Sequence, residues 1–308
     1  MSGTQSERTT VDRACRFRRI SGAGFRLVFE ITRRCNFRCR HCFIRPDESH
    51  PNGEDIIRLI HEAAAAGCRK LILTGGEPLI RNDLETIVTE AVAAGVLADL
   101  NSNLYLLSAK RARSLKKAGL QEASVSFYGS EAVHDRLTGC KGSFARTLEN
   151  MEHLRQVGIE VDVHGAVWDA MLDTIGPLIE KLQQCGVASV TFFSILEDRQ
   201  SGCRSAYPLE ARPAIDVIEK IRNKAAIPIR TVGLPPLDKG ECVMGAGIYG
   251  LGAELFLRPC LLSRSDNPGI DVRPMSFQDA RKEIDAQVRN GTWQPACCRD
   301  ATERGKPC

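Results

Sequence analysis

The sequence predicts an α/β protein in which parallel strands alternate with helices. Between residues 25 and 230, one unit recurs six times: a short apolar or β-branched run, a loop, then an amphipathic stretch. Most of the amphipathic stretches are followed by a glycine. Alternation at this spacing is typical of parallel strands joined by right-handed crossovers. Six units are too few for a complete eight-unit barrel, so a partial (β/α)6 barrel and a doubly wound sheet both fit.

The individual elements follow from apolar periodicity. The expected strands are Phe25–Ile31, Lys70–Leu73, Ala98–Asn101, Ala123–Phe127, Glu160–Val167 and Ser189–Phe193. Five helices between them are expected to end at Gly67, Gly95, Gly119, Gly158 and Gly186. Glycine suits these positions because helices commonly close with a residue in the left-handed conformation. A sixth helix is expected over residues 209–223.

The amino-acid composition of the sequence changes after residue 230. A Pro- and Gly-rich stretch precedes a short apolar run at Leu255–Leu257, a helix near Ser276–Asn290 and a cysteine-rich tail. We therefore expect three parts: a basic N-terminal arm (1–24), a main domain (25–230) and a small extension (231–308). The extension has little apolar mass of its own, so we expect a metal to hold it together.

Composition and charge exclude several classes of protein. The chain has 308 residues, 43% of them hydrophobic and 26% charged, which is typical of an ordinary globular protein. No run approaches the roughly 18 apolar residues of a membrane span, and no secretory signal is visible. Most of the net charge of +4 lies in the N-terminal arm, whereas a nucleic-acid binder shows a basic face across its body. We expect a cytoplasmic enzyme without nucleic-acid or membrane partners.

The 13 cysteines are unusual for a chain without an export signal, and such cysteines more often bind metal than form disulfides. Cys35, Cys39 and Cys42 lie within eight residues, directly after the first expected strand. A structural zinc site usually takes four protein ligands, and no fourth lies nearby. A [4Fe–4S] cluster held by three thiolates leaves one iron open for a cofactor or substrate. From spacing alone, zinc or a chance cluster remain alternatives.

Two motifs together resemble the radical S-adenosylmethionine (radical SAM) enzymes. The first is the C-x3-C-x2-C pattern of the cysteine loop. The second is Gly75-Gly76-Glu77-Pro78, which follows the second strand and matches the Gly-Gly-Glu-Pro motif of the family. Two glycines let the backbone approach a ligand closely, and Glu77 offers an acceptor for a cationic amine.

Weaker matches follow the third and fourth strands. Ser102-Asn103-Leu104 occupies the place of the Thr-Asn-Gly of the family, with leucine in place of the glycine, so only Asn103 carries over as a SAM contact. Val125-Ser126-Phe127-Tyr128-Gly129 resembles Val-Ser-Leu-Asp-Gly, and Ser126 fits a polar contact to the SAM ribose or carboxylate. A strand-end cap is the alternative role for Asn103 and Ser126.

The resemblance implies a fold and a reaction. The fold is a partial (β/α)6 barrel, in which SAM chelates the open iron of the first cluster. One electron, from a donor such as flavodoxin or ferredoxin, breaks a carbon–sulfur bond of SAM and gives a 5′-deoxyadenosyl radical. That radical takes a hydrogen atom from the substrate, while the protein aims it and excludes solvent.

The cysteines of the tail resemble the twitch extension, a shorter relative of the SPASM domain. They are Cys242, Cys260, Cys297, Cys298 and Cys308. The resemblance implies one auxiliary [4Fe–4S] cluster, with one of the adjacent Cys297 and Cys298 completing the set together with Cys308. A structural zinc site is the alternative.

We expect roles for three further residues from their positions in the sequence. Cys140 lies in a Gly-rich loop after the fourth strand, and some members of the family that invert a stereocentre return a hydrogen atom from a cysteine thiol; an ordinary loop thiol is the alternative. His41 is expected beside the cluster rather than as a ligand, and His164 as a strand residue rather than a base.

The substrate is expected to be a small polar natural product, carbohydrate- or aminocyclitol-like, that is oxidised or epimerised. The alternative is epimerisation or crosslinking of a ribosomally made peptide, as in other twitch-bearing enzymes. The arm over residues 1–24 is too short for a peptide-leader-binding module, which favours the small molecule. A non-enzymatic iron–sulfur or zinc protein would have no use for Gly75–Pro78.

Overall fold

The computed structural model describes residues 24–42, 44, 47–194, 211–232, 247–261, 267–291 and 293. Its strands are β1 (Phe25–Thr32), β2 (Cys68–Gly75), β3 (Leu97–Ser102), β4 (Glu122–Ser126), β5 (Glu160–Val167), β6 (Ser189–Ser194), β7 (Ile229–Val232), β8 (Ile248–Leu251), β9 (Phe256–Arg258) and β10 (Ile270–Asp271). Its helices are α2 (Gly53–Ala65), η1 (Pro78–Ile80), α3 (Leu84–Ala93), α4 (Ala109–Ala118), α5 (Glu131–Thr138), α6 (Ser143–Gln156), η2 (Asp169–Met171), α7 (Leu172–Gln184), α9 (Ala211–Arg222) and α10 (Phe277–Arg289). Among these, no helix has the length and apolar character needed to cross a membrane. All but the last residue of the expected N-terminal arm lies outside the described residues.

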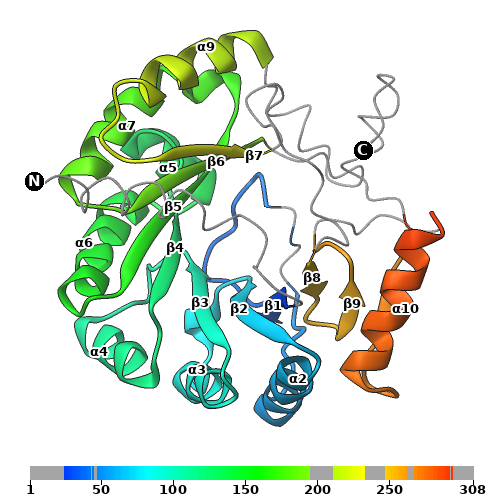
Figure 1. Cartoon of the computed structure of the whole chain (residues 1–308). Helices are drawn as coiled ribbons and strands as arrows, with labels where there is room; N and C mark the ends of the chain where they lie inside the picture. The colour runs from blue at the N-terminus through cyan, green and yellow to red at the C-terminus, as the bar shows by residue number, and fades with distance from the viewer. Residues whose placement is uncertain are drawn as a thin grey trace, which may run out of the picture.

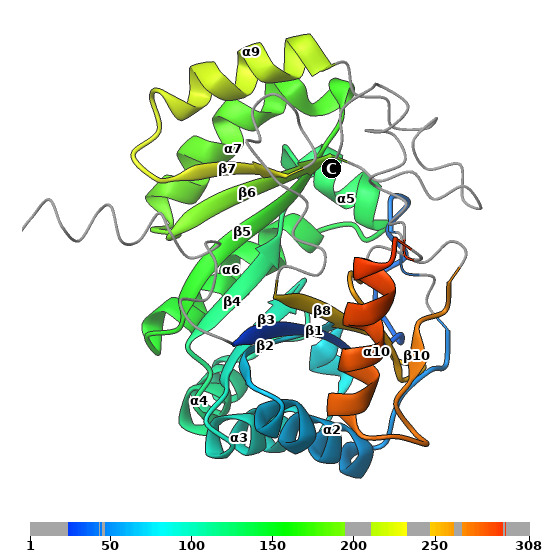
Figure 2. The same ribbon diagram turned by 45° about the vertical axis from the view of Figure 1, so that its right-hand side comes forward.

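The described strands form one sheet in the order β10-β9-β8-β1-β2-β3-β4-β5-β6-β7. β8 and β1 to β7 run parallel, whereas β9 and β10 are antiparallel. β1 to β7 follow one another in chain order, without the reversal of a doubly wound sheet. The sheet curves with its helices outside (Figures 1 and 2). The open, partial barrel of the radical SAM type is therefore confirmed.

All six expected strands form. Two further parallel strands, β7 and β8, were not predicted. β8 lies in the Pro- and Gly-rich stretch and has only four residues, one of them glycine. Such a short run carries too little periodicity to distinguish a strand from a loop. Register with the neighbouring strand β1 determines its conformation instead.

The expected helix ends are also confirmed. The five glycines named above have φ values between 67° and 105°, the left-handed region in which a side chain is costly. The helix expected over 209–223 is α9, and the one near 276–290 is α10.

The two faces of the sheet differ in polarity. Along β4, Ala123 and Val125 are fully buried in the core shared with the helices, whereas Glu122, Ser124 and Ser126 stay partly accessible. Along β4, the outer face is thus apolar and the inner face is polar. A closed barrel instead fills its interior with branched apolar side chains.

The described part of the extension joins the main fold. β8 pairs with β1, and the ring of Phe277 in α10 stacks on Phe25 at 5.9 Å between ring centroids. Tyr249 contacts the same ring at 5.2 Å, and Ile284 is fully buried. The described part of the extension therefore shares the core of the main fold, and the expectation that a metal holds the extension together stays a prediction.

Candidate active site

The cysteine loop follows β1 at the carboxyl edge of the parallel strands. Cys35, Cys39 and Cys42 are thiols that are partly accessible to solvent. Burial, together with the nearby Cys42 and Cys35, raises the pKa of Cys39 strongly, so the three sulfur atoms lie close enough to interact electrostatically. This is the environment in which a positively charged iron centre would favour the thiolate forms.

The donor set is compatible with a cluster. Three neighbouring thiols, which interact electrostatically, can each bind a separate iron of a [4Fe–4S] cube and leave the fourth iron open. A structural zinc ion usually takes a fourth protein ligand.

The carboxyl end of α5 supports the cysteine loop. The N–H groups of Arg38 and Arg40 donate to the carbonyls of Thr138 (3.3 Å) and Leu137 (3.0 Å). These are the carbonyls that the end of a helix leaves without a partner. The same junction places Cys140 in electrostatic contact with Cys39.

The two glycines of the Gly-Gly-Glu-Pro motif make room for the cysteine loop. A Cβ atom on Gly75 would lie 2.1 Å from the carbonyl oxygen of Thr32, and one on Gly76 would lie 2.2 Å from that of Arg34. The N–H of Gly76 donates to Thr32 at 2.8 Å. The two glycines thus allow one loop to approach another closely. Their close approach to a ligand stays a prediction. Pro78 starts η1, directly after the motif's acid.

The carboxylate of Glu77 is fully buried and faces the protein. It accepts hydrogen bonds from the N–H of Leu79 (2.9 Å), the hydroxyl of Ser102 (2.7 Å) and the N–H of Asn103 (2.8 Å). Burial raises the pKa of Glu77, and these hydrogen bonds oppose the rise. In the described structure this side chain joins the loops after β2 and β3. Its role as an acceptor for a cationic amine stays a prediction.

Asn103 connects the loop after β3 to the cysteine loop. Its side-chain amide donates to Asn36 at 3.0 Å, and its side-chain oxygen accepts from the N–H of Tyr105 at 2.9 Å. The following Leu104, which replaces the glycine of the family, has a φ of 57° and is fully buried. Leucine therefore adopts a backbone conformation that normally favours glycine.

Ser126 ends β4 on the same edge, partly accessible on the inner face. Its side chain is hydrogen-bonded to that of Tyr128, whose pKa is raised by burial and by the nearby cysteines. The ring of His41 lies 4.5 Å from that of Tyr128, and the N–H of Tyr128 donates to Nδ1 of His134 at 3.3 Å. Tyr128 and His134 were not predicted as parts of the site. Their adjacency to the expected SAM contact is the signal that could have found them.

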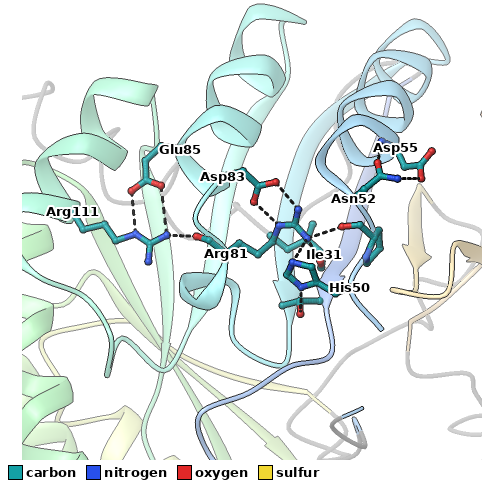
Figure 3. A network of polar contacts seen from close by, with 10 residues as sticks. Ile31, His50, Asn52, Asp55, Arg81, Asp83, Glu85 and Arg111 are labelled. Atoms are coloured by element: carbon teal, nitrogen blue, oxygen red, sulfur yellow. Dashed lines mark hydrogen bonds and ion pairs between the residues drawn. The ribbon is translucent and has the colours of Figure 1, made fainter. Parts of the chain in front are cut away.

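A second set of residues missed by the sequence analysis lies behind the motif (Figure 3). Arg81 is 2% exposed, and its Nη1 donates to the carbonyls of Ile31 (3.0 Å) and Pro51 (2.8 Å). These carbonyls lie at the two ends of the segment that contains the cysteines. The ion pair with Asp83 (2.6 Å) orients the guanidinium, and Nε2 of His50 lies 3.3 Å from it. A buried arginine three residues after the proline was the available signal.

Of the expected auxiliary ligands, only Cys260 lies within the described residues. It is a partly accessible thiol just after β9. The neighbouring Leu261 covers Gly250 of β8, where a Cβ atom would lie 2.6 Å from the Leu261 backbone. Cys242, Cys297, Cys298 and Cys308 lie outside the described residues.

Comparison with known proteins agrees with this geometry. The model of the radical SAM superfamily matches residues 29–191, and the chain belongs to that family. SAM and a [4Fe–4S] cluster are the cofactors of this family.

Individual relatives are more distant. An AdoMet-dependent heme synthase of Methanosarcina barkeri is 30% identical over 215 residues, covering 68% of this chain and 62% of the relative. A PqqA peptide cyclase of Rhodopseudomonas palustris is 30% identical over 165 residues, covering 52% and 44%. The chain thus spans about half of the length of these relatives. SuiB of Streptococcus suis, solved with its precursor peptide SuiA, has a TM-score of 0.75 at 13% identity, covering 92% of this chain and 71% of SuiB; this likeness shows the fold.

Proposed function

We infer that this chain reductively cleaves SAM at a [4Fe–4S] cluster held by Cys35, Cys39 and Cys42, and takes a hydrogen atom from a small polar substrate. One observation carries the inference. Three thiols lie near one another at the carboxyl edge of a parallel sheet, on a loop packed against Gly75 and Gly76. Ligand sites of β/α folds lie at this edge.

When bound, the cluster and SAM together supply the 5′-deoxyadenosyl radical. The chain's own residues hold and orient the reactants. Asn103 and Ser126 are proposed SAM contacts, since both are partly accessible at the ends of β3 and β4. The backbone of Gly75–Pro78 is proposed to line a third side of the SAM site. Glu77 holds the loops after β2 and β3 together through its three hydrogen bonds.

The proposed reaction is oxidation or epimerisation of a carbohydrate- or aminocyclitol-like compound. The polar inner face of the sheet supports a polar substrate. Cys140 is the proposed hydrogen-atom donor for an epimerisation, supported by its position near enough to Cys39 for an electrostatic interaction. For an oxidation, an auxiliary cluster in the twitch-like extension (231–308) would accept the second electron, and an external flavodoxin or ferredoxin would supply the first.

The proposed ligands of the auxiliary cluster come from the extension. They are Cys242, Cys260, Cys297, Cys298 and Cys308, of which Cys297 and Cys298 are alternatives to each other. The position of Cys260 beside the inner side of β8 is compatible with a cluster near the substrate.

A peptide substrate is the second candidate, favoured by the names of two relatives. One relative is a PqqA peptide cyclase, and SuiB was solved with a precursor peptide. The same radical chemistry would then epimerise or crosslink a ribosomally made peptide.

The first test is iron and sulfide per chain after anaerobic reconstitution. We expect about eight irons in the wild type, and about four when Cys35, Cys39 and Cys42 are all replaced by alanine, given four irons per cube. The triple variant should lose reductive SAM cleavage. A Cys185→Ala variant is the control, because this thiol lies at the end of α7.

The iron counts of the wild type and of the triple variant test different parts of the proposal. Retained SAM cleavage in the triple variant would refute the radical SAM site proposed here. A wild type with about four irons that fall to none would leave that site intact but remove the auxiliary cluster, and with it the electron acceptor for an oxidation.

A further inference from the structure

The inner face of the sheet carries polar side chains that the SAM chemistry does not explain. Along β4 and β5, Val125 and Val163 are fully buried in the core shared with the helices, whereas Ser124, Ser126 and His164 on the opposite face stay partly accessible. Helices lie on the outer side of these central strands (Figure 1). The three polar side chains therefore lie on the inner side of the sheet.

Near the amino ends of the strands, this face carries charges that compensate one another. Lys70 forms ion pairs with Asp99 and with Glu122, the latter at 3.2 Å. On the other side, Arg230 donates a hydrogen bond to the hydroxyl of Ser189 at 3.1 Å. A charged substrate would find its counter-charges already engaged with protein groups.

A row of directly paired residues crosses the inner face one layer higher. Ser126 pairs with His164, His164 with Thr191, and Thr191 with Arg230. We call these four residues the inner row. It begins at Ser126, the proposed SAM contact, so a molecule lying along the row is next to SAM. Neighbouring strands are about 4.8 Å apart, so Ser126 to Thr191 spans roughly 10 Å.

The middle of the inner row offers neutral hydrogen-bonding groups. Thr191 is 0% exposed, and its hydroxyl has no hydrogen-bond partner. A buried hydroxyl without a partner is destabilising, which is a reason to expect a ligand there. Burial lowers the pKa of His164 to about 4, so at neutral pH its ring offers one donor and one acceptor.

We propose that His164 and Thr191 bind hydroxyl groups of a polyhydroxylated ring, a cyclitol or sugar, held next to SAM. A ring hydroxyl both donates and accepts, as these two side chains do. An apolar substrate would leave Thr191 without a partner. The spacing of the row suits groups on a single ring rather than a long chain. The assignment rests on the proposed function and names two residues that bind its substrate.

The test compares two Thr→Val variants in the reconstituted, SAM-loaded enzyme. Thr191→Val keeps the shape and removes the hydroxyl, and Thr89→Val changes an exposed threonine on α3. Calorimetry measures binding of myo-inositol, 2-deoxystreptamine, glucosamine and a ten-residue polar peptide. We expect at least one ring compound to bind, Thr191→Val to weaken it about tenfold, and Thr89→Val to leave it unchanged.

Thermal unfolding separates binding from a structural role. Because Thr191→Val removes a hydroxyl without a partner, the ligand-free variant should melt at or above the wild-type temperature. A lower melting temperature, unchanged ring affinity, or binding of the peptide alone or of no probe would overturn the proposal. Absence of SAM cleavage in the wild type would refute the proposed function instead, since binding is measured without reduction.

Discussion

At the scale of residues, Gly75, Gly76 and Leu104 each meet a steric constraint on the backbone at the sheet edge that carries the site. Gly75 and Gly76 have no side chain where the backbone of the cysteine loop passes. Leu104 instead accepts a φ of 57° and keeps its side chain fully buried. Its N–H donates to Ser102 at 2.9 Å, and its carbonyl accepts from Asn150 at 2.8 Å. Core packing and these bonds hold a conformation that is unfavourable for leucine.

We predict that Leu104→Gly is more stable than Leu104→Ala. Both variants lose the buried side chain, at a cost of about 2–5 kcal/mol, but only glycine adopts this backbone conformation without a further cost of about 1 kcal/mol. Urea unfolding of both variants measures the difference. At the equally buried Leu100 in β3, where the backbone is extended, the order should be reversed. Alanine more stable than glycine at position 104 would contradict the prediction.

At the scale of elements, the site depends on loops that are tied to one another more than on any single strand. Glu77 joins the loops after β2 and β3, and Asn103 reaches back to the cysteine loop. Behind them, Arg81 holds both ends of that loop, and Arg111 of α4 donates to the carbonyl of Arg81 and pairs with Glu85 at 3.0 Å (Figure 3). A change in the position of one loop is therefore expected to displace the others.

We predict that Arg81→Gln lowers the free energy of unfolding by about 3 kcal/mol, because the bonds of a buried guanidinium to two carbonyls and to the Asp83 side chain, which is 40% exposed, are lost. Arg81→Lys should rescue little, since lysine lacks the planar fork that reaches Ile31, Pro51 and Asp83 together. Both variants should also lose iron faster to a chelator than the wild type does.

The control for this prediction is Arg58→Gln on α2. Its side chain is 40% exposed and pairs with Glu62 on the surface, where ion pairs contribute about 0–1 kcal/mol. Equal stability and equal iron loss in the Arg81 and Arg58 variants would show that Arg81 does not position the cysteine loop.

At the scale of the whole molecule, the curved sheet places a neutral histidine inside the protein. Burial lowers the pKa of His164 to about 4, from about 6.5 in an unfolded chain. Between these values the unfolded state binds more protons than the native state, so stability is lost as pH falls from about 6.5 toward 4.

We predict that His164→Gln flattens the pH dependence of stability in this window. The slope should fall by up to one proton, or about 1.4 kcal/mol per pH unit. Denaturant unfolding of wild type and variant at several pH values between 4 and 7 measures it. Parallel curves would show that His164 remains protonatable in the native state.

Much of the molecule followed from local patterns. Apolar periodicity predicted six strands, and five glycines marked helix ends, because both signals lie within a few residues of the feature they report. The cysteine loop and the Gly-Gly-Glu-Pro motif were found in the same way. β7 and β8 were missed, since four-residue strands owe their conformation to a neighbour rather than to their own sequence.

The sequence by itself therefore determined the class of fold, the cysteine loop and the membership in the radical SAM family. Only the tertiary structure decided which way the side chains face. In the folded chain, the carboxylate of Glu77 is buried and bonded within the protein, and Arg81 binds both ends of the cysteine loop. Ser126, His164 and Thr191 lie in one row. The physical reason is that these contacts join segments far apart in the chain, whose register and curvature no local pattern records.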